Sequence, residues 1–335
     1  MLRKMKRTRK WWLIGALLAV AVLIAGVYLS GWLDVVLGNR ESLGLIEVGS
    51  PVQSVAFSPD GTLLAVGSQD GAARVWLMDD DLEPGQALVQ ATVFSPQGRE
   101  TSYSHDVAFS PDGTALAFGL PDGTVRLWRV TDGMLLHTLK GDVDRICSLA
   151  FSPDGHILAA GDWNGRVILW QVADGTVLET LEDHTIGVVG VAFSPDGTTL
   201  ASVSLDLTTK VWDVASATLI HELVNPSVAT GVAFSPDGSL LAVDQQLWSV
   251  RDWRPVREMD AVRGGMGNVA FSPDGKLLAA GNAWYEVRWW QVADGVLLRT
   301  MKSHTDSVNS VAFSPNGKTL ASGSLDGTVR LWRVP

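Results

Sequence analysis

One seven-residue phrase, with minor variants, recurs seven times along the chain. It reads Val-Ala-Phe-Ser-Pro-Asp-Gly in five copies, begins with Leu in the copy at 149–155, and has Asn for Asp in the copy at 311–317. The phenylalanines of the phrase are Phe57, Phe109, Phe151, Phe193, Phe234, Phe271 and Phe313, at spacings of 52, 42, 42, 41, 37 and 42 residues. Self-similarity at this period predicts a repeat architecture, which decides the fold before any finer pattern is considered.

A single repeat has the pattern of four short β-strands. The last copy contains β-like runs at 308–313, 320–324 and 328–332, separated by a Ser-Pro-Asn-Gly turn and an Asp-Gly turn. Proline presets φ at the first central position of the Ser-Pro-Asn-Gly turn, and glycine accepts the positive φ at its end. Other copies add an Asp-Gly pair and a fourth run, such as Val177–Leu181. Because one such sheet cannot bury both of its faces, the repeats are expected to pack radially as blades.

The phrase, an Asp-Gly and then a tryptophan, at about 42 residues, resembles the WD40-repeat family. The matching tryptophans are Trp76, Trp128, Trp170, Trp212, Trp248, Trp290 and Trp332. The resemblance covers roughly residues 43–335 and implies an all-β fold, a seven-bladed β-propeller. The seventh repeat lacks a fourth run, whereas the segment Leu43–Val48 resembles the run Val296–Met301. We therefore expect residues 43–48 to supply the missing strand and close the ring.

Blades of this family often carry a hydrogen-bonded set of His, Ser or Thr, Asp and Trp. By position the resemblance assigns His184, Asp206 and Trp212 to blade four and His304, Asp326 and Trp332 to blade seven, completed by Ser202 or Ser204 and by Ser322 or Ser324. Blade three departs from the pattern, with Asp142 at the histidine position and Asn164 at the aspartate position. Buried polar groups need partners, so these sets are interpreted as structural.

The N-terminal segment predicts a membrane anchor. Residues 1–10 hold six basic side chains and no acidic one, and residues 11–33 carry no charge. As a helix the uncharged run is roughly 34 Å long, enough to cross a bilayer. Aromatic residues that favour the membrane interface stand near its ends, at Trp11, Trp12, Tyr28 and Trp32. We expect a basic cytoplasmic tail at 1–10, a transmembrane signal-anchor helix at 11–33, a linker at 34–42 and the propeller at 43–335.

The basic flank predicts a single-pass protein of the cell membrane, with its N-terminus in the cytoplasm and its propeller outside it. The alternative of a cleaved signal peptide is disfavoured because the apolar run is too long and ends in Ser-Gly-Trp-Leu-Asp. Inverted insertion, with the propeller in the cytoplasm, is a further alternative. An anchored repeat protein of this type looks bacterial.

Charge and composition disfavour several functions. Without the six basic residues of the tail, 20 basic and 36 acidic side chains remain, which argues against nucleic-acid binding. The sequence contains no motif for a catalytic nucleophile, a zinc protease or a phosphate loop, and no histidine pair with metal-ligand spacing. We therefore predict a non-enzymatic protein with no catalytic residues, metal or cofactor. The single cysteine, Cys147, is expected to be a small buried hydrophobe.

Specificity is expected where the repeats are irregular. In this family the loops between strands two and three, and those leading to the next blade, form the usual partner-binding face. The predicted partner-binding residues on that face are Trp163, Trp284, Tyr285, Arg145, Leu205 and Tyr103. The ten surplus residues of the first repeat are assigned to a protruding loop at Phe94–His105. Blade five is five residues short at Asp244-Gln245-Gln246, which predicts a notch.

The favoured hypothesis is a membrane-anchored propeller that binds a protein or peptide through its loop face, acting as an interaction scaffold. An assembly factor with an obligate partner is a variant that the sequence does not separate from it. The alternative is an extracytoplasmic receptor for a small ligand or carbohydrate, or a hydrolase, that uses the mouth of the propeller channel. In that alternative Trp163, Trp284 and Tyr285 stack on sugar rings.

Overall fold

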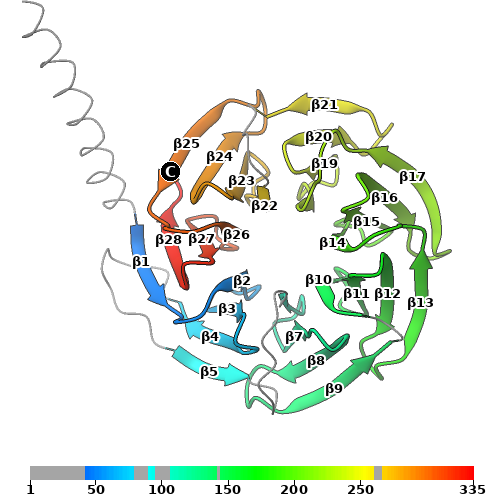
Figure 1. The fold of residues 1–335 in the computed structure, drawn as a ribbon, viewed down its shortest axis with the longest axis horizontal. Helices are drawn as coiled ribbons and strands as arrows, with labels where there is room; N and C mark the ends of the chain where they lie inside the picture. The colour runs from blue at the N-terminus through cyan, green and yellow to red at the C-terminus, as the bar shows by residue number, and fades with distance from the viewer. Residues whose placement is uncertain (1–41, 79–89, 95–105, 142–143, 260–265) are drawn as a thin grey trace, which may run out of the picture. The chain divides into compact units, whose positions relative to one another are not determined.

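The computed structural model describes residues 42–78, 90–94, 106–141, 144–259 and 266–335. Every regular element in these residues is a β-strand, and the 28 strands form seven four-stranded antiparallel sheets arranged as a ring (Figure 1). The all-β, seven-bladed architecture expected from the repeats is confirmed for this part of the chain. None of the described residues forms a helix with the length and apolar character needed to cross a membrane. The predicted transmembrane helix at 11–33 lies outside them.

The first four blades are built in chain order, from the channel outward. Blade one has β2 (Val52–Phe57), β3 (Leu63–Ser68), β4 (Ala73–Leu77) and β5 (Gln90–Phe94). Blade two has β6 (Val107–Phe109), β7 (Ala115–Gly119), β8 (Thr124–Arg129) and β9 (Leu135–Lys140). Blade three has β10 (Ile146–Phe151), β11 (Ile157–Asp162), β12 (Arg166–Gln171) and β13 (Val177–Glu182). Blade four has β14 (Val188–Phe193), β15 (Thr199–Ser204), β16 (Thr208–Asp213) and β17 (Thr218–Val224).

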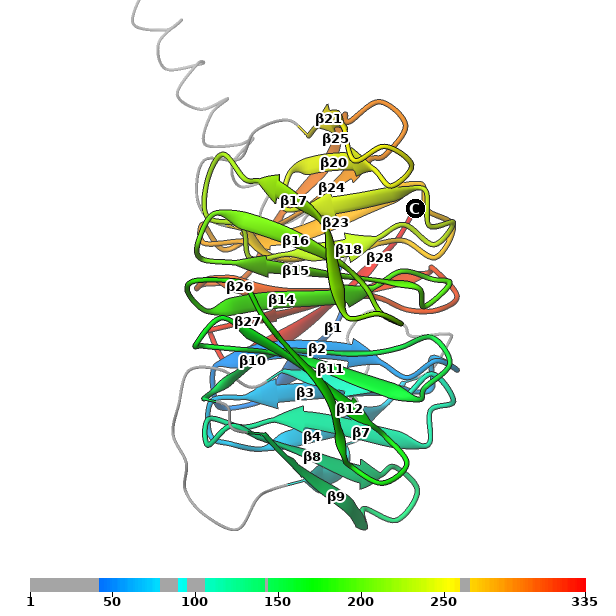
Figure 2. The ribbon, with the colours of Figure 1, turned by 90° about the vertical axis from the view of Figure 1, so that its right-hand side faces the viewer.

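The last three blades complete the ring, which Figure 2 shows edge-on. Blade five has β18 (Val232–Phe234), β19 (Leu240–Val243), β20 (Gln246–Ser249) and β21 (Pro255–Glu258). Blade six has β22 (Met266–Phe271), β23 (Leu277–Asn282), β24 (Glu286–Gln291) and β25 (Leu297–Lys302). Blade seven has β26 (Val308–Phe313), β27 (Thr319–Ser324), β28 (Thr328–Arg333) and, as its outer strand, β1 (Ser42–Glu47).

The recurring phrase forms the inner strand and the turn after it. In blade one, Ser58 Oγ donates to Asp60 Oδ1 over 2.6 Å and accepts the N–H of Leu63 over 2.9 Å, while Gly61 takes a φ of 76°. Each phrase glycine also faces the phrase proline of the preceding blade. A Cβ built on Gly61 would lie 3.5 Å from Cδ of Pro315, and so the contact runs across the ring closure from blade seven to blade one. The phrase is therefore both a turn and an inter-blade contact.

The surplus of the first repeat is distributed differently from the prediction. The connection from β4 to β5 spans residues 78–89, and the one from β5 to β6 spans residues 95–106. Both are longer than their counterparts in blade two, residues 130–134 and 141–145. Phe94 ends the outer strand β5 and does not begin a loop. Residues 95–105, which hold most of the predicted loop and Tyr103, lie outside the described residues.

The N-terminal strand β1 occupies the position that the sequence assigns to residues 43–48. It pairs antiparallel with β28, with Ile46 opposite Val329. Leu43 and Ile46 are 5% and 4% exposed and belong to a core cluster shared with blade one, whereas Leu45 points outward and is 44% exposed. Strands from the two ends of the propeller segment thus share one sheet, which joins blade seven to the strand that leads into blade one.

We expect Ile46→Ala in the full chain to lower the free energy of unfolding by about 2–5 kcal/mol, the usual cost of a large-to-small change in a core. The matched control, Leu45→Ala on the opposite face of the same strand, should change it by less than about 0.5 kcal/mol. Chemical denaturation of the three proteins measures both values. Equal effects of the two changes would show that β1 does not contribute to ring closure.

Candidate interaction face and central channel

Blades four and seven each hold a histidine in a hydrogen-bonded set. In blade four, Nδ1 of His184 lies 2.9 Å from Oδ2 of Asp206, and Nε2 lies 2.9 Å from Oγ of Ser202. The indole N–H of Trp212 donates to the same serine oxygen over 2.9 Å. The set therefore links the inter-blade connection, the hairpin and the core tryptophan of one blade.

Blade seven repeats this arrangement. His304 lies 2.9 Å from Asp326 and 2.8 Å from Ser322, and Trp332 donates to Ser322 over 2.8 Å. The other two serines that the sequence left open bond to backbone carbonyls instead, Ser204 to Ile186 and Ser324 to Asp306. The structure thus brings together all six predicted residues of the two sets and selects Ser202 and Ser322 as their fourth members.

Burial and hydrogen bonding shift the pKa values of these groups in the same way in both blades. Desolvation lowers the pKa of His184 and of His304, and the carboxylate beside each opposes this effect only in part. Burial alone would raise the pKa of Asp206, but hydrogen bonds from Thr208, the Thr185 N–H and His184 outweigh it and hold that pKa at about 2. The stable pair is a neutral imidazole with Nδ1 protonated, donating to an ionised carboxylate. Such a pair is suited to fastening a hairpin.

Blades three and six use other side chains at their hairpins. Asp162, which is fully buried, accepts the N–H groups of Asn164 over 3.0 Å and Arg166 over 2.7 Å. Asn282 accepts the N–H groups of Trp284 over 2.9 Å and Glu286 over 3.0 Å. Sequence reasoning missed Asp162 and Asn282 because it looked for the acceptor at the family's aspartate position, which lies two residues later in each hairpin. Asp142 lies outside the described residues, so its predicted place at the histidine position is untested.

The predicted aromatic residues lie exposed in the hairpins between second and third strands. Trp163, Trp284 and Tyr285 are 40%, 53% and 45% exposed. Tyr285 has a φ of 68°, as has Leu207 in blade four, at positions where other hairpins have glycine. Bulky residues rarely adopt this left-handed conformation, and strain of this kind clusters at functional sites. These hairpins, and the connections between successive blades, form the surface that we call the loop face.

Trp163 is held by two neighbours on the loop face. The guanidinium carbon of Arg145 lies 4.5 Å from the centre of the indole ring, and the backbone N–H of Trp163 donates to the Arg145 carbonyl over 3.0 Å. On the next connection, a Cβ built on Gly187 would lie 3.3 Å from Cε3 of Trp163. The indole therefore packs on neighbouring loops and still presents a large exposed surface. Leu205 is half-buried, and Tyr103 lies outside the described residues.

Three exposed apolar side chains on the loop face were not predicted: Ile186, Leu207 and Val228. Backbone hydrogen bonds join the loops that carry them. Leu205 N–H donates to Gly187 O over 3.1 Å, and Asn225 N–H donates to Leu207 O over 2.8 Å. The sequence could have indicated these three residues, because each is a large apolar residue in a connection or hairpin of the loop face.

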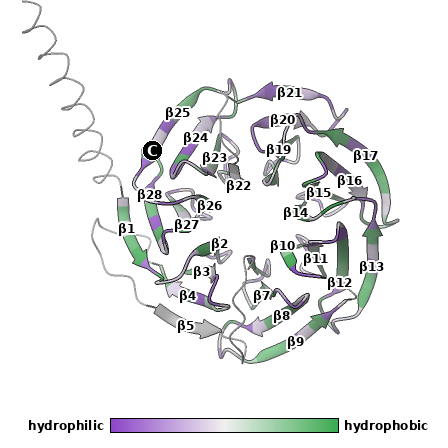
Figure 3. Cartoon of the chain, viewed as in Figure 1, coloured by the Kyte–Doolittle hydropathy of each residue, from purple (hydrophilic) through white to green (hydrophobic). Residues whose placement is uncertain are grey.

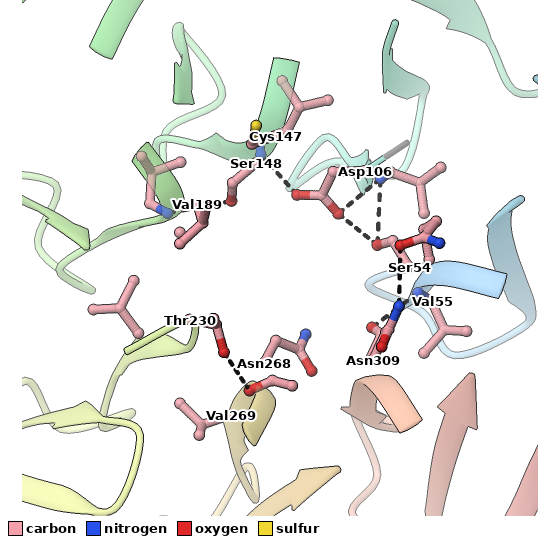
Figure 4. A pocket seen from close by; sticks show the side chains of 18 residues that line it. Ser54, Val55, Asp106, Cys147, Ser148, Val189, Thr230, Asn268, Val269 and Asn309 are labelled. Carbon is pink, nitrogen blue, oxygen red and sulfur yellow. Dashed lines mark hydrogen bonds between the residues drawn. The ribbon is translucent and has the colours of Figure 1, made fainter. Parts of the chain in front are cut away.

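The inner strands enclose a central channel with a cavity of about 380 Å³ (Figure 4). A belt of hydrogen bonds runs around it from blade to blade. Side-chain oxygens of Ser54, Asp106, Ser148, Asn268 and Ser310 accept the backbone N–H groups of Val107, Leu149, Val191, Val311 and Val55, over 2.6–3.4 Å. The acceptor always precedes the phrase by one residue. At the two remaining junctions, on either side of blade five, that position holds Gly190 or Gly231.

Asp106 is the one charged side chain among the residues that line this cavity. It accepts hydrogen bonds from Ser54, from the Val107 N–H over 2.9 Å and from the Leu149 N–H over 2.7 Å. Burial raises its pKa, and these hydrogen bonds oppose the shift only in part. Cys147 also lines the channel and is half-buried, which corrects the expectation that it is a core residue. No group of His, Cys, Asp or Glu suited to a metal is found in the described part of the chain.

The lowered histidine pKa values predict a pH dependence of stability. Below pH 6.5 the unfolded chain binds more protons at these two sites than the folded one, so their contribution to the free energy of unfolding falls as the pH falls from about 6.5. The double variant His184→Asn/His304→Asn should be less stable at pH 7.5 and should lose this slope. Denaturation at pH 7.5, 6.5 and 5.5 measures it, with exposed His156→Asn as the control. An unchanged slope in the double variant would refute the assignment.

Comparison with known proteins identifies the family. The model described as "WD domain, G-beta repeat" matches residues 45–76, 91–129, 133–171, 175–213 and 295–333, together more than half of the chain. The unmatched stretch 214–294 contains the short blade five and the aromatic hairpin of blade six.

Among similar proteins, Periodic tryptophan protein 2 of Arabidopsis thaliana is 32% identical over 100 residues, 28% of this chain and 9% of that protein. The F-box-like/WD repeat-containing protein TBL1X of Mus musculus is 36% identical over 94 residues, 27% of this chain and 18% of that protein. The U4/U6 small nuclear ribonucleoprotein PRP4-like protein of Arabidopsis thaliana is 36% identical over 91 residues, 27% of this chain and 15% of that protein. The alignments thus span less than a fifth of each relative. On the strength of the repeat match, the chain belongs to the WD40-repeat family.

Proposed function

We propose that this protein is a non-enzymatic, membrane-anchored interaction scaffold that docks a protein or peptide partner on its loop face. The observation that carries the proposal is the exposure of Trp163, Trp284 and Tyr285 on that face. Large aromatic side chains contribute a disproportionate share of binding energy at protein interfaces. The hydrogen-bonded sets of blades four and seven have a structural role in fastening their hairpins, so a catalytic role is not needed to account for their buried polar residues.

The surroundings of Trp163 suit a protein partner. Arg145 covers part of the indole and offers a charged group at the edge of an apolar surface. Ile186 and Leu207 extend the apolar surface onto blade four. An apolar centre with a polar rim is the usual composition of a protein interface. The excess of acidic residues over basic ones in residues 11–335 disfavours a nucleic-acid partner.

The loop-face proposal predicts that Trp163→Ala/Trp284→Ala weakens partner capture from crosslinked membranes by at least about tenfold without lowering the melting temperature. The matched control is Leu178→Ala/Ile220→Ala. It removes two apolar side chains of similar exposure from the outer strands β13 and β17, which Figure 3 shows as partly hydrophobic. The control should capture the same partner as the parent. Equal capture by all three proteins would refute this binding site. Loss of capture with the control alone would place the binding site on the outer strands of the propeller.

The N-terminal segment supports the membrane part of the proposal. Six basic residues precede 23 uncharged ones, and this order favours a cytoplasmic N-terminus with the propeller on the other side. A protease added to intact, outer-permeabilised cells should then remove a tag fused after Pro335 and spare one fused before Met1. Removal of the N-terminal tag alone would indicate inverted insertion, and protection of both tags until the cells are lysed would show that the segment does not cross the membrane; either result would place the propeller in the cytoplasm.

A second candidate is a receptor for a small ligand, favoured by the channel cavity and by Asp106 on its wall. A polar cavity of this volume is within the range of ligand pockets. This candidate becomes the leading one if the parent protein captures no partner. A variant of the first proposal, an assembly factor with an obligate partner, has some support from the name of one relative, a small nuclear ribonucleoprotein protein.

A further inference from the structure

Blade five has a cavity on the loop face where its hairpin is short. In blade four the last pair of the hairpin between the second and third strands is Val203–Thr209. In blade five the last pair of the corresponding hairpin is Val243–Gln246, and only Asp244 and Gln245 connect the two strands. The shortening leaves a cavity of about 80 Å³, lined among others by Asn225, Asp244 and Trp248. We call this cavity the blade-five notch.

The notch lies where blade four keeps its histidine and serine. Strand register makes the positions equivalent: Val191 pairs with Ser202 in blade four, and Val232 pairs with Val243 in blade five. A valine therefore replaces the serine that accepts the tryptophan N–H. Asn225 stands at the histidine position, seven residues before the phrase, but it bonds to Thr209 over 3.2 and 3.0 Å. Neither replacement offers an acceptor to the blade tryptophan.

Two hydrogen-bonding groups of the notch consequently lack partners among the described residues. The indole N–H groups of Trp248 and of Trp290 in blade six are buried and unpaired, whereas Trp212 and Trp332 donate to serines. Of the two unpaired tryptophans, Trp248 lines the notch. Oδ1 of Asp244 accepts the N–H groups of Thr230 over 3.0 Å and Gly231 over 2.8 Å, and its Oδ2 makes no hydrogen bond there. The notch thus presents a buried donor, an available acceptor and a space between loops.

We propose that the blade-five notch binds an imidazole side chain of the docked partner, which takes the place that His184 fills in blade four. The unprotonated ring nitrogen accepts a hydrogen bond from the Trp248 indole N–H, and the ring N–H donates to Asp244. Blades four and seven supply the precedent, since each holds an imidazole between a carboxylate and the acceptor of a tryptophan N–H. The assignment of the imidazole to a partner protein rests on the proposed docking function. The ability of the notch to bind an imidazole does not depend on that function.

The probe is imidazole, titrated into the full-length protein in detergent micelles with ¹⁵N-labelled tryptophan indoles. We expect the Trp248 indole resonance, assigned by Trp248→Phe, to shift saturably with a dissociation constant on the order of millimolar. The Trp212 and Trp332 resonances should not move, because serines occupy their N–H groups. Asp244→Asn should weaken the binding at least tenfold, since the amide replaces an acceptor by a donor while it retains Oδ1 and tolerates the left-handed φ of 46°. Asp252→Asn, in an exposed turn of the same blade, is the matched control.

No shift of Trp248, or equal shifts of all three resonances, would overturn the proposal. Two further arms separate its parts. A Gly/Ser peptide with one histidine should compete with imidazole and its alanine counterpart should not; competition by neither would restrict the notch to free small molecules and overturn the partner assignment. Partner capture through Trp163 and Trp284 without an imidazole response would leave the docking function standing and remove only the notch.

Discussion

The packing of each blade against its neighbour is the interaction on which the rest of this structure depends. A four-stranded sheet buries its faces only when another sheet covers them, so every blade requires two neighbours and the ring must close. The phrase serves this need twice. Its glycine rests against the proline of the preceding blade, as Gly61 does on Pro315, and the residue before it joins the channel belt, as Ser310 does with the Val55 N–H. Strand β1 completes the sheet of blade seven by pairing with β28.

Because inter-blade contacts occupy the inner strands and the sheet faces, the loop face is where residues can change without opening the ring. The chain uses this freedom unevenly. Blades four and seven keep histidine sets that fasten their hairpins, whereas blade six carries Trp284 and a strained Tyr285 in the same place. A hairpin fastened by a buried imidazole–carboxylate pair has its polar groups satisfied internally. A hairpin that exposes aromatic rings instead leaves surface for another molecule, and this difference is the basis for placing function in the irregular blades.

Features that recur in every repeat could be predicted from the sequence. Contacts that depend on strand register or on residues from different blades could not. The seven repeats followed from their regular spacing, and the closing strand from the likeness of residues 43–48 to the fourth run of another repeat. The histidine sets followed from the resemblance to the WD40 family, carried over by position, because each repeat places the same residue at the same point of its sheet. The choice of Ser202 over Ser204 did not follow, since both lie in β15 and only strand register decides which one faces Trp212. Asp106 was missed because its partners Ser54 and Leu149 come from two other blades. The ten surplus residues of the first repeat were assigned to a single loop, because the spacing between repeats gives the number of extra residues and not the connection that contains them.

Blade five concentrates features that oppose stability and that ring closure does not require. Asp244 adopts a left-handed conformation, burial raises its pKa to about 6, the indole N–H of Trp248 has no partner among the described residues, and the channel belt is replaced by glycines at both junctions of the blade. A raised carboxyl pKa means that ionisation of Asp244 at neutral pH costs stability, the opposite of the effect of Asp206 in blade four. Blades four and seven demonstrate that this scaffold can satisfy the same positions internally. The indole N–H of Trp290 in blade six is also unpaired, but in blade five the unpaired N–H stands beside an opening on the loop face, which is the arrangement expected where stability is given up for binding.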